Sequence, residues 1–194
     1  MKQDIILAGV GGQGILSIAT VIGSAALEQG LYLKQAEVHG MSQRGGDVQS
    51  NLRISSEPVS SDLIPRGAAD LIVSLEPMEA LRYVPYLAPD GWIITNTTPF
   101  VNIPDYPDPE KVMAALKAYP HVIAIDVDAM AKALQSPRSA NMVLLGATAA
   151  VLRILDPEKL RDGIRRIFGR KGEAVVESNI KAFDAGFASA VKEQ

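Results

Sequence analysis

Residues 5–14 read Ile-Ile-Leu-Ala-Gly-Val-Gly-Gly-Gln-Gly, and this stretch decides the fold. Its apolar run over 5–10 predicts a buried strand covered on both faces, as is usual in a parallel sheet. Apolar side chains then recur with a helical period over 15–26, and Gly30 is placed to end that helix. A strand, a glycine-rich turn and a helix in this order are typical of the start of an α/β fold.

The rest of the chain continues the alternation. A strand over 31–36 would complete a βαβ unit, residues 4–36, with a right-handed crossover. We expect further strands at 48–54, 71–75, 92–95 and 122–125, a turn at 89–91, and helices over 77–87, 109–118, 129–134 and 141–152. The predicted fold class is α/β, a doubly wound, mostly parallel, Rossmann-like sheet over about 1–155. Only helical patterns follow, so residues 156–194 are expected to form a C-terminal helical cap on the sheet, within one domain spanning 1–194.

Composition excludes several classes of protein. The 194 residues include 19 basic and 22 acidic side chains, and a net charge of −3 gives no reason to expect nucleic-acid binding. With 47% apolar residues the chain can bury a core, and no apolar run reaches the roughly 18 residues that predict a membrane span. There is no cysteine, which excludes disulfides and thiolate-bound iron–sulfur clusters within this chain. We expect a cytoplasmic protein with no signal peptide, metal site or membrane contact.

The glycine loop, residues 9–14, fits the pattern G-x-G-x-x-G between a strand and a helix. Glycines allow close approach of a ligand, and a helix N-terminus offers unpaired N–H groups to an anion. Glu37 follows after about 20 residues, where an acid binds a ribose hydroxyl in dinucleotide sites. A nucleotide site and glycines that only pack strand against helix both remain open, and the bulk of Gln13 argues against NAD. The candidate phosphate-binding residues are Gly9, Gly11, Gly12, Gln13 and Gly14.

A second feature is the stretch 37–46, Glu-Val-His-Gly-Met-Ser-Gln-Arg-Gly-Gly, which we call the 37–46 motif. It has three glycines, many polar side chains and neither a helical nor a strand period. The motif is therefore expected to be a long loop, and loops of this kind usually carry function.

Together these motifs resemble the gamma-type subunit of 2-oxoacid:ferredoxin oxidoreductases, most of all the indolepyruvate branch of that family. The similarity extends from residue 4 to about 155 and continues more loosely through the terminal helices. It rests on the glycine loop, the 37–46 motif, Leu63-Ile64-Pro65 before Ala69-Asp70-Leu71, Glu76–Arg82, and Asn141–Ala147.

The resemblance implies a subunit that is inactive alone and assembles with a larger partner. That partner is expected to carry thiamine diphosphate, Mg and 4Fe-4S clusters, in agreement with the lack of cysteine here. The complex would oxidatively decarboxylate an aryl 2-oxoacid, pass two electrons to ferredoxin and yield an acyl-CoA. The glycine loop would then bind a phosphate-bearing part of coenzyme A, or present its helix N-terminus to the partner.

Within the 37–46 motif, the resemblance implies an active-site or interface loop. Arg44 is the best candidate for binding an anion, since a guanidinium pairs bidentately with carboxylate or phosphate, although it can instead pair with Glu37 or Asp47. His39 is a candidate for proton transfer or a structural residue. Met41 is expected to pack at the interface. The candidate catalytic residues are His39, Gln43 and Arg44, and the whole candidate loop comprises Glu37, His39, Gly40, Met41, Ser42, Gln43, Arg44, Gly45 and Gly46.

Three hypotheses follow for the function. The first is the accessory subunit of such a complex, the second a stand-alone NAD(P)- or FAD-binding protein, and the third a structural interface subunit without ligand. A basic cluster near the C-terminus is either a solvated helix face or a docking surface for acidic ferredoxin. Its members are Arg161, Arg165, Arg166, Arg170 and Lys171.

Overall fold

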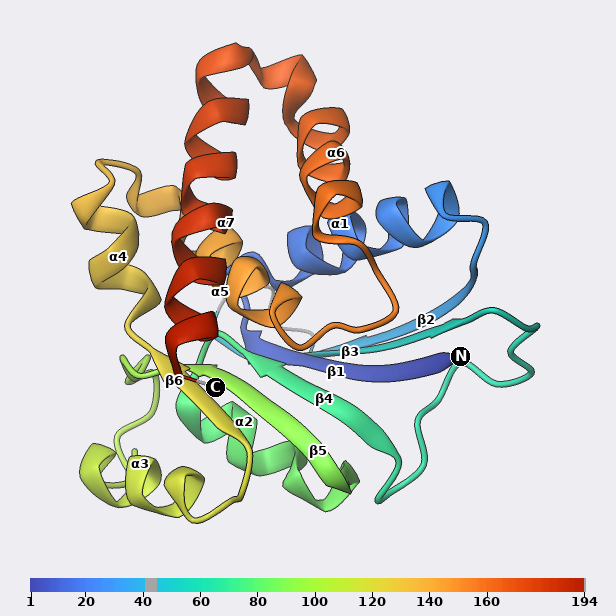
Figure 1. Cartoon of the computed structure of the whole chain (residues 1–194). Coiled ribbons are helices and arrows are strands. Elements are labelled where there is room, and N and C mark those ends of the chain that lie inside the picture. Colours follow the sequence, from blue (N-terminus) through green and yellow to red (C-terminus); the bar gives the residue numbers. More distant parts are fainter. Residues whose placement is uncertain (41–44, 194) are drawn as a thin grey trace.

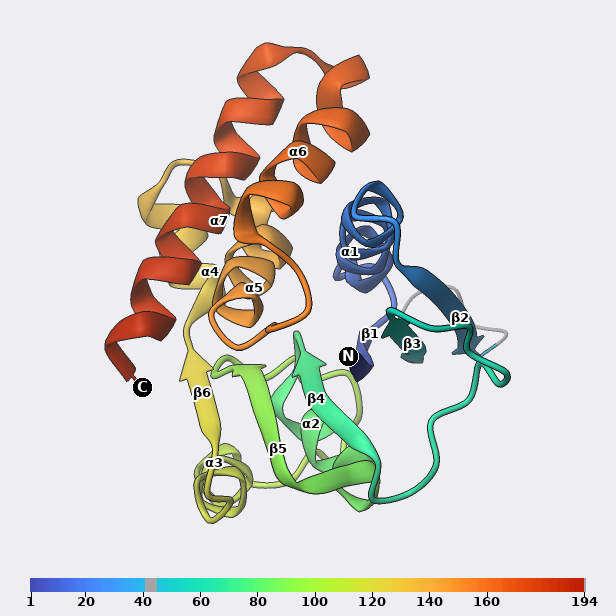
Figure 2. The ribbon, with the colours of Figure 1, turned by 45° about the vertical axis from the view of Figure 1, so that its right-hand side comes forward.

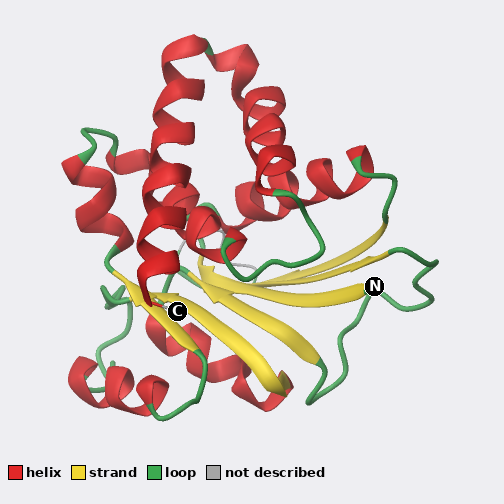
Figure 3. Cartoon of the chain, viewed as in Figure 1, coloured by secondary structure: helices red, strands yellow, loops and turns green. Residues whose placement is uncertain are grey.

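The computed structural model describes residues 1–40 and 45–193, which form a six-stranded sheet with helices on both faces (Figures 1 and 3). The strands are β1 (Lys2–Val10), β2 (Tyr32–His39), β3 (Asp47–Ser55), β4 (Ala69–Ser74), β5 (Leu87–Asn96) and β6 (Val122–Ile125). The helices are α1 (Ile15–Glu28), α2 (Pro77–Tyr83), α3 (Pro109–Lys117), α4 (Val127–Ala133), α5 (Ala140–Ala149), α6 (Pro157–Phe168) and α7 (Glu173–Glu193). Within the described ranges, no helix is long and apolar enough to cross a membrane.

The sheet is mixed but mostly parallel, with the order β2-β3-β1-β4-β5-β6. β1, β4, β5 and β6 are joined by parallel pairing. β3 pairs antiparallel with both β1 and β2, so β2 runs in the same direction as β1. The predicted α/β class is confirmed by this arrangement.

β1, α1 and β2 form the predicted βαβ unit, since β2 is parallel to β1, but the two strands are not neighbours because β3 lies between them. β3 buries Leu52 and Ile54 completely, whereas Tyr32 and Val38 of β2 are 51% and 58% exposed. The inner strand is therefore the more deeply buried one, although β2 has no fewer apolar residues. The two strands form a hairpin across the 37–46 motif, with Glu37 opposite Ser50.

The central strand β1 is buried on both faces, as its continuous apolar run predicts. Ile5 and Leu7 face the core beneath α1 and α5, while Ile6 and Ala8 face the core above α2 and α3. α1 and α2 accordingly lie on opposite faces of the sheet (Figure 1). The alternation of side chains along a strand explains why an uninterrupted apolar run is needed here.

Two predicted boundaries between 77 and 95 were wrong. α2 ends at Tyr83 and is followed by a 3₁₀ turn containing Pro85, which has no N–H to continue an α-helix. β5 then begins at Leu87, so the expected turn at 89–91 lies within a strand. Its pairing with β4 is irregular there, and a Cβ on Gly91 would lie only 2.9 Å from the carbonyl oxygen of Ala69.

The C-terminal helices pack mainly on other helices rather than on the sheet. α6 lies against α1 and α7 lies against α5, which gives a second helical layer (Figure 2). The crossing of α5 and α7 is close because both helices place a glycine there. A Cβ on Gly146 would lie 1.9 Å from the carbonyl oxygen of Phe183, and one on Gly186 equally close to that of Val143.

Candidate functional site

The glycine loop turns the chain from the end of β1 into α1. Gly12 and Gly14 have φ angles of +102° and +89°, in the region that glycine adopts without a steric penalty. A Cβ on Gly12 would meet no atom within 4 Å, so the outer side of the loop is open. Gly9 serves a different purpose, since it pairs with Val48 inside the sheet and its missing Cβ makes room for Ile15. Gly11, Gly12 and Gly14 therefore form the accessible part of the loop.

Gln13 is turned inward and is occupied by the fold. Its Oε1 accepts the N–H of Val10 at 2.7 Å, and its Nε2 donates to the carbonyl oxygen of Leu75 at 3.2 Å. The side chain thus ties the end of β1 to the end of β4. A bound phosphate would have to use the backbone of the loop rather than this amide.

The glycine loop and the end of the 37–46 motif are in direct contact. The N–H of Gly11 donates to the carbonyl oxygen of Gly46 at 2.8 Å, and a longer bond of 3.4 Å joins Gly45 to Gly11. Asn102, from the segment after β5, donates through Nδ2 to the carbonyl oxygen of Gly45 at 2.6 Å. Three segments that are distant in sequence therefore meet at the carboxyl end of β1.

The first residues of the 37–46 motif extend β2 instead of forming a loop, which corrects the expected boundary. Because side chains alternate along a strand, Glu37 and His39 share one face and Val38 points to the other. Oε1 of Glu37 lies 3.9 Å from Nε2 of His39, and Nδ1 of His39 is 3.2 Å from the carbonyl oxygen of Gly40. Both side chains remain accessible to solvent.

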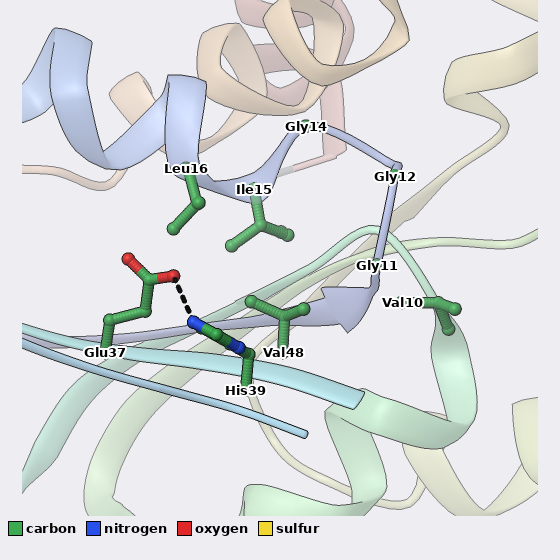
Figure 4. Close-up of a pocket in the computed structure, with 9 residues that line it drawn as sticks. All are labelled: Val10, Gly11, Gly12, Gly14, Ile15, Leu16, Glu37, His39 and Val48. Carbon is green, nitrogen blue, oxygen red and sulfur yellow. Dashed lines mark ion pairs between the residues drawn. The ribbon is translucent and has the colours of Figure 1, made fainter. Parts of the chain in front are cut away.

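These two side chains and the glycine loop enclose one cavity of about 360 Å³ (Figure 4). Gly11, Gly12 and Gly14 form one wall, Glu37 and His39 the opposite wall, and Ile15, Leu16 and Val48 supply apolar surface. The first turn of α1 adds backbone N–H groups that have no partner within the helix. A cavity of this size with few polar groups suits part of a small molecule or cofactor.

A second hollow, of about 320 Å³, lies on the other side of the glycine loop. Gly12 and Gly14 line it together with Leu75, Asn96 and Arg138. This hollow lies at the edge of the sheet where α1 and α2 depart on opposite faces. Ligands of open α/β sheets bind at such points. The glycine loop therefore separates two hollows at the carboxyl edge of the sheet.

Sequence reasoning missed two polar side chains that hold this edge together. Asn96 donates to Asp128 at 2.9 Å and accepts the N–H of Val127 at 3.2 Å. Glu76 is buried, caps α2 and accepts the hydroxyl of Tyr106. Burial and this hydrogen bond raise the pKa of Tyr106, so its hydroxyl stays a donor. A polar residue directly after a buried strand is the signal that could have identified both.

Comparison with known proteins identifies the family. A family model described as pyruvate ferredoxin/flavodoxin oxidoreductase matches residues 4–189. The chain belongs to this family. The indolepyruvate oxidoreductase subunit IorB of Archaeoglobus fulgidus is 34% identical over 98% of the chain and 96% of the relative. The IorB of Pyrococcus horikoshii is 36% identical over 98% of the chain and 97% of the relative.

Solved structures agree with this assignment to the pyruvate ferredoxin/flavodoxin oxidoreductase family. The 2-oxoglutarate:ferredoxin oxidoreductase of Magnetococcus marinus, with 2-oxoglutarate, coenzyme A and succinyl-CoA bound, has a TM-score of 0.76 at 25% identity. The match covers 98% of our chain but only 31% of that one. The pyruvate oxidoreductase subunit PORC of Thermotoga maritima, at 23% identity and a TM-score of 0.74, shares the fold over 96% of both chains. Since the relatives are oxidoreductase subunits, the predicted family and the prediction of an oxidoreductase subunit are confirmed.

In this family member, the structure brings together only part of the predicted site. Gly11, Gly12, Gly14, Glu37 and His39 line one cavity, whereas Gly9 and Gln13 are used by the fold. Met41, Ser42, Gln43 and Arg44 lie outside the described residues, so their predicted roles stay predictions. Across 1–40 and 45–193, no group of three or more His, Asp or Glu side chains is arranged to hold a metal ion.

Proposed function

We propose that the chain is the subunit of an indolepyruvate or arylpyruvate:ferredoxin oxidoreductase that does not bind thiamine diphosphate. In this role it forms one wall of the site where coenzyme A meets the reacting centre. The observation that carries the proposal is the similarity to IorB subunits, 34–36% identity over almost the whole of both chains. Such coverage supports a common place in a common complex.

The reaction of that complex takes a 2-oxoacid, coenzyme A and two oxidised ferredoxins. Carbon dioxide leaves, the acyl group joins the thiol of coenzyme A, and two electrons pass to the ferredoxins with release of one proton. We assign thiamine diphosphate, Mg and the 4Fe-4S clusters to the larger partner subunit. The absence of cysteine from the 194 residues supports this division, because thiolates are the usual cluster ligands.

The cavity beside the glycine loop is the part of this chain that suits coenzyme A. Its open backbone at Gly12 and the N-terminus of α1 favour a phosphate group. Ile15, Leu16 and Val48 favour the less polar parts of the same molecule. The Magnetococcus relative, in which the matching region makes up 31% of a longer chain, has coenzyme A bound, which supports coenzyme A as a ligand of the complex.

The test compares two substitutions on one helix in the assembled complex. Leu16 is 42% exposed and lines the cavity, whereas Leu27 is 65% exposed at the far end of α1. Leu16→Glu places a negative charge where a phosphate is expected, so the KM for coenzyme A should rise about tenfold or more. Leu27→Glu should leave it unchanged. Equal KM values in both variants would contradict the assignment of the cavity.

Assembly is tested separately. The tagged chain, recovered from its own cells, should retain a larger, cysteine-rich, thiamine-binding subunit, and the pair should reduce ferredoxin when given arylpyruvate and coenzyme A. The isolated chain should be inactive. Activity of the isolated chain, or the absence of such a partner, contradicts the proposal.

A stand-alone nucleotide-binding protein is the second candidate, favoured by one observation. Glu37 faces the glycine loop across a single cavity, which is the layout of a dinucleotide site with an acid for the ribose hydroxyl. Calorimetric titration with NAD, NADP and FAD separates the two candidates. Micromolar binding of any of them to the isolated chain favours the stand-alone nucleotide-binding protein. If none of them gives a heat of binding, that candidate is excluded.

A further inference from the structure

A third hollow, which the proposed function does not use, lies between the helices on the side of α1 away from the sheet. It has a volume of about 470 Å³ and is bounded by the start of α5, the end of α6 and the first turns of α7. Its polar lining includes Arg138, Lys171, Ser136, Ser139, Ser178 and Asn141. We call it the Arg138 cavity.

The cations of this cavity are without a negative partner inside the described part of the chain. Arg138 makes no hydrogen bond or ion pair there, and the ammonium of Lys171 lies only over the ring of Phe168, at 5.3 Å. No acidic residue lines the cavity among the described residues. Both cations are exposed, so their charges are partly screened by solvent, but an anion in the hollow would be attracted by both of them.

Three neighbouring cations of α6 are, in contrast, paired with carboxylates. Arg161 pairs with Glu158 and Asp184. Arg165 pairs with Asp162, and Arg166 pairs with Glu28. Most of the basic cluster is therefore neutralised within the chain, and Lys171 is a member whose charge is left available to the cavity.

The serines of the cavity leave a hydrogen-bond donor for a ligand. Ser178 is bonded to Ser136, and Ser136 lies 2.7 Å from the hydroxyl of Ser139. The three hydroxyls have three protons but form only two hydrogen bonds with one another, so one proton is left over whichever hydroxyl donates. Ser139 is only 3% exposed, which places part of this chain of serines away from bulk water.

The Arg138 cavity and the second hollow, which the glycine loop borders, share part of their lining. Arg138 and Asn141 line both spaces, and Gly12 and Gly14 line the second. The side chain of Asn141 also donates to the carbonyl oxygen of Gly14 at 3.2 Å, so the two sites share a wall. A ligand of nucleotide size that occupies the second hollow would therefore lie beside Arg138.

We propose that the Arg138 cavity binds a phosphate monoester group. A guanidinium, an ammonium and a hydroxyl donor match an anion that carries a charge near −2 and three acceptor oxygens at neutral pH. The group belongs either to free inorganic phosphate or to a nucleotide whose remainder lies at the glycine loop. The second source rests on the proposed function, whereas the first does not.

The experiment titrates the full chain by calorimetry at constant ionic strength. The probes are inorganic phosphate, coenzyme A and 3′-dephospho-coenzyme A, which lacks the monoester. The test variant is Arg138→Gln with Lys171→Gln. The control is Arg170→Gln with Lys181→Gln, which changes the net charge equally at exposed cations that do not line the cavity. Thermal unfolding checks that both double variants are folded.

Either of two results supports the proposal. Inorganic phosphate that binds the wild type and the control, and binds the test variant about tenfold more weakly, indicates the free anion. Coenzyme A that binds about tenfold more tightly than its dephospho form, with this difference lost only in the test variant, indicates a nucleotide. The proposal is overturned if the wild type binds no phosphate and does not distinguish the two coenzymes, or if the test variant behaves as the wild type. The proposed function survives that outcome, because partner assembly and the effect of Leu16→Glu do not involve Arg138 or Lys171.

Discussion

Gln13 shows how a residue of a ligand-binding pattern can be used by the fold instead. Its amide joins Val10 to Leu75, across the gap between β1 and β4. From the sequence, Gln13 is larger and more polar than a phosphate-binding glycine loop requires. The structure explains why a long side chain is present. The side chain has to span two strand ends.

We predict that Gln13→Ala destabilises the chain by about 2 kcal/mol, since two hydrogen bonds of roughly 1 kcal/mol each are lost. Gln13→Glu should be at least as damaging, because a carboxylate accepts the N–H of Val10 but cannot donate to Leu75. Urea unfolding measures both free energies.

Gln35 provides the control, because it is exposed and its amide makes one hydrogen bond, to the hydroxyl of Ser50. Gln35→Ala should change stability by less than about 1 kcal/mol. Equal stabilities for the two alanine variants would contradict the role given to Gln13.

Glu28 gives a prediction about pH. It accepts hydrogen bonds from Arg166 and Lys159 of α6, at 2.6 and 3.1 Å, and these bonds lower the pKa of Glu28 from its usual 4.5. A carboxyl whose pKa is lower in the folded state stabilises the fold above its unfolded-state pKa. That contribution is lost as the pH falls through the folded-state pKa.

The stability difference between wild type and Glu28→Gln should therefore be larger near pH 7 than near pH 3. Chemical unfolding at the two pH values measures it. Glu57→Gln serves as the control, because Glu57 is exposed and its carboxylate makes no ion pair within the described residues. A difference for Glu28→Gln that stays constant between the two pH values would show that its ion pairs do not stabilise the docking of α6 on α1.

At the scale of elements, the crossing of α5 and α7 depends on two glycines. Since a Cβ at Gly146 or Gly186 would lie 1.9 Å from a backbone oxygen of the other helix, the helices must separate to admit alanine. We predict that each alanine substitution destabilises the chain by about 1–3 kcal/mol or more. Gly169 is the matched control, because it has a helical φ of −53° and a Cβ there would meet no atom within 4 Å.

Gly169→Ala should be neutral or stabilising by up to about 1 kcal/mol, since alanine restricts the unfolded chain. Thermal and urea unfolding distinguish these outcomes. If Gly146→Ala and Gly169→Ala have the same effect, close helix contact is not what fixes glycine in α5.

The elements also show which parts of the fold the sequence can predict. Asp108 and Asp156 each precede a proline and a glutamate, and both cap their helices as that local pattern predicts. The position of β3 between β1 and β2 is not a local property. Burial of Leu52 and Ile54 shows that β3 is an inner strand, but periodicity does not say which strand lies beside it.

The same distinction applies to the site. The glycine loop is found from sequence because its turn and the following helix are local features. The Arg138 cavity combines Ser17, Arg138, Lys171 and Ser178, which only the packing of α1, α5 and α7 brings together. Glu37 lies between these cases, since its spacing from the loop is local in sequence while its place across the cavity depends on the hairpin with β3.

At the scale of the whole molecule, the edge that carries the glycine loop also exposes apolar side chains. Phe100, Val101 and Ile103 are 44%, 65% and 43% exposed. Their segment is nevertheless held in place, because the N–H of Phe100 donates to Glu76 and Asn102 donates to Gly45. A fixed segment with outward apolar side chains is typical of a surface that a partner covers.

Under the proposed function, this apolar surface indicates where the complex assembles. In the Magnetococcus relative, the region that matches our chain makes up 31% of a single longer chain. Under the proposed function, our chain contacts a larger partner subunit. The apolar segment beside the glycine loop is where we expect the larger subunit to dock, since the coenzyme must reach both chains there.

We predict that Val101→Asp with Ile103→Asp weakens copurification with the larger subunit at least about tenfold, because two buried charges would lack partners at the interface. The isolated variant should keep the stability of the wild type, as both side chains are exposed. Leu27→Asp with Val191→Asp is the control, at 65% and 52% exposed positions on α1 and α7. Binding measured by immobilising the larger subunit should be unchanged for the control. Equal binding of both double variants would show that the larger subunit does not dock on this apolar segment at the carboxyl edge of the sheet. The glycine loop would then face solvent in the complex.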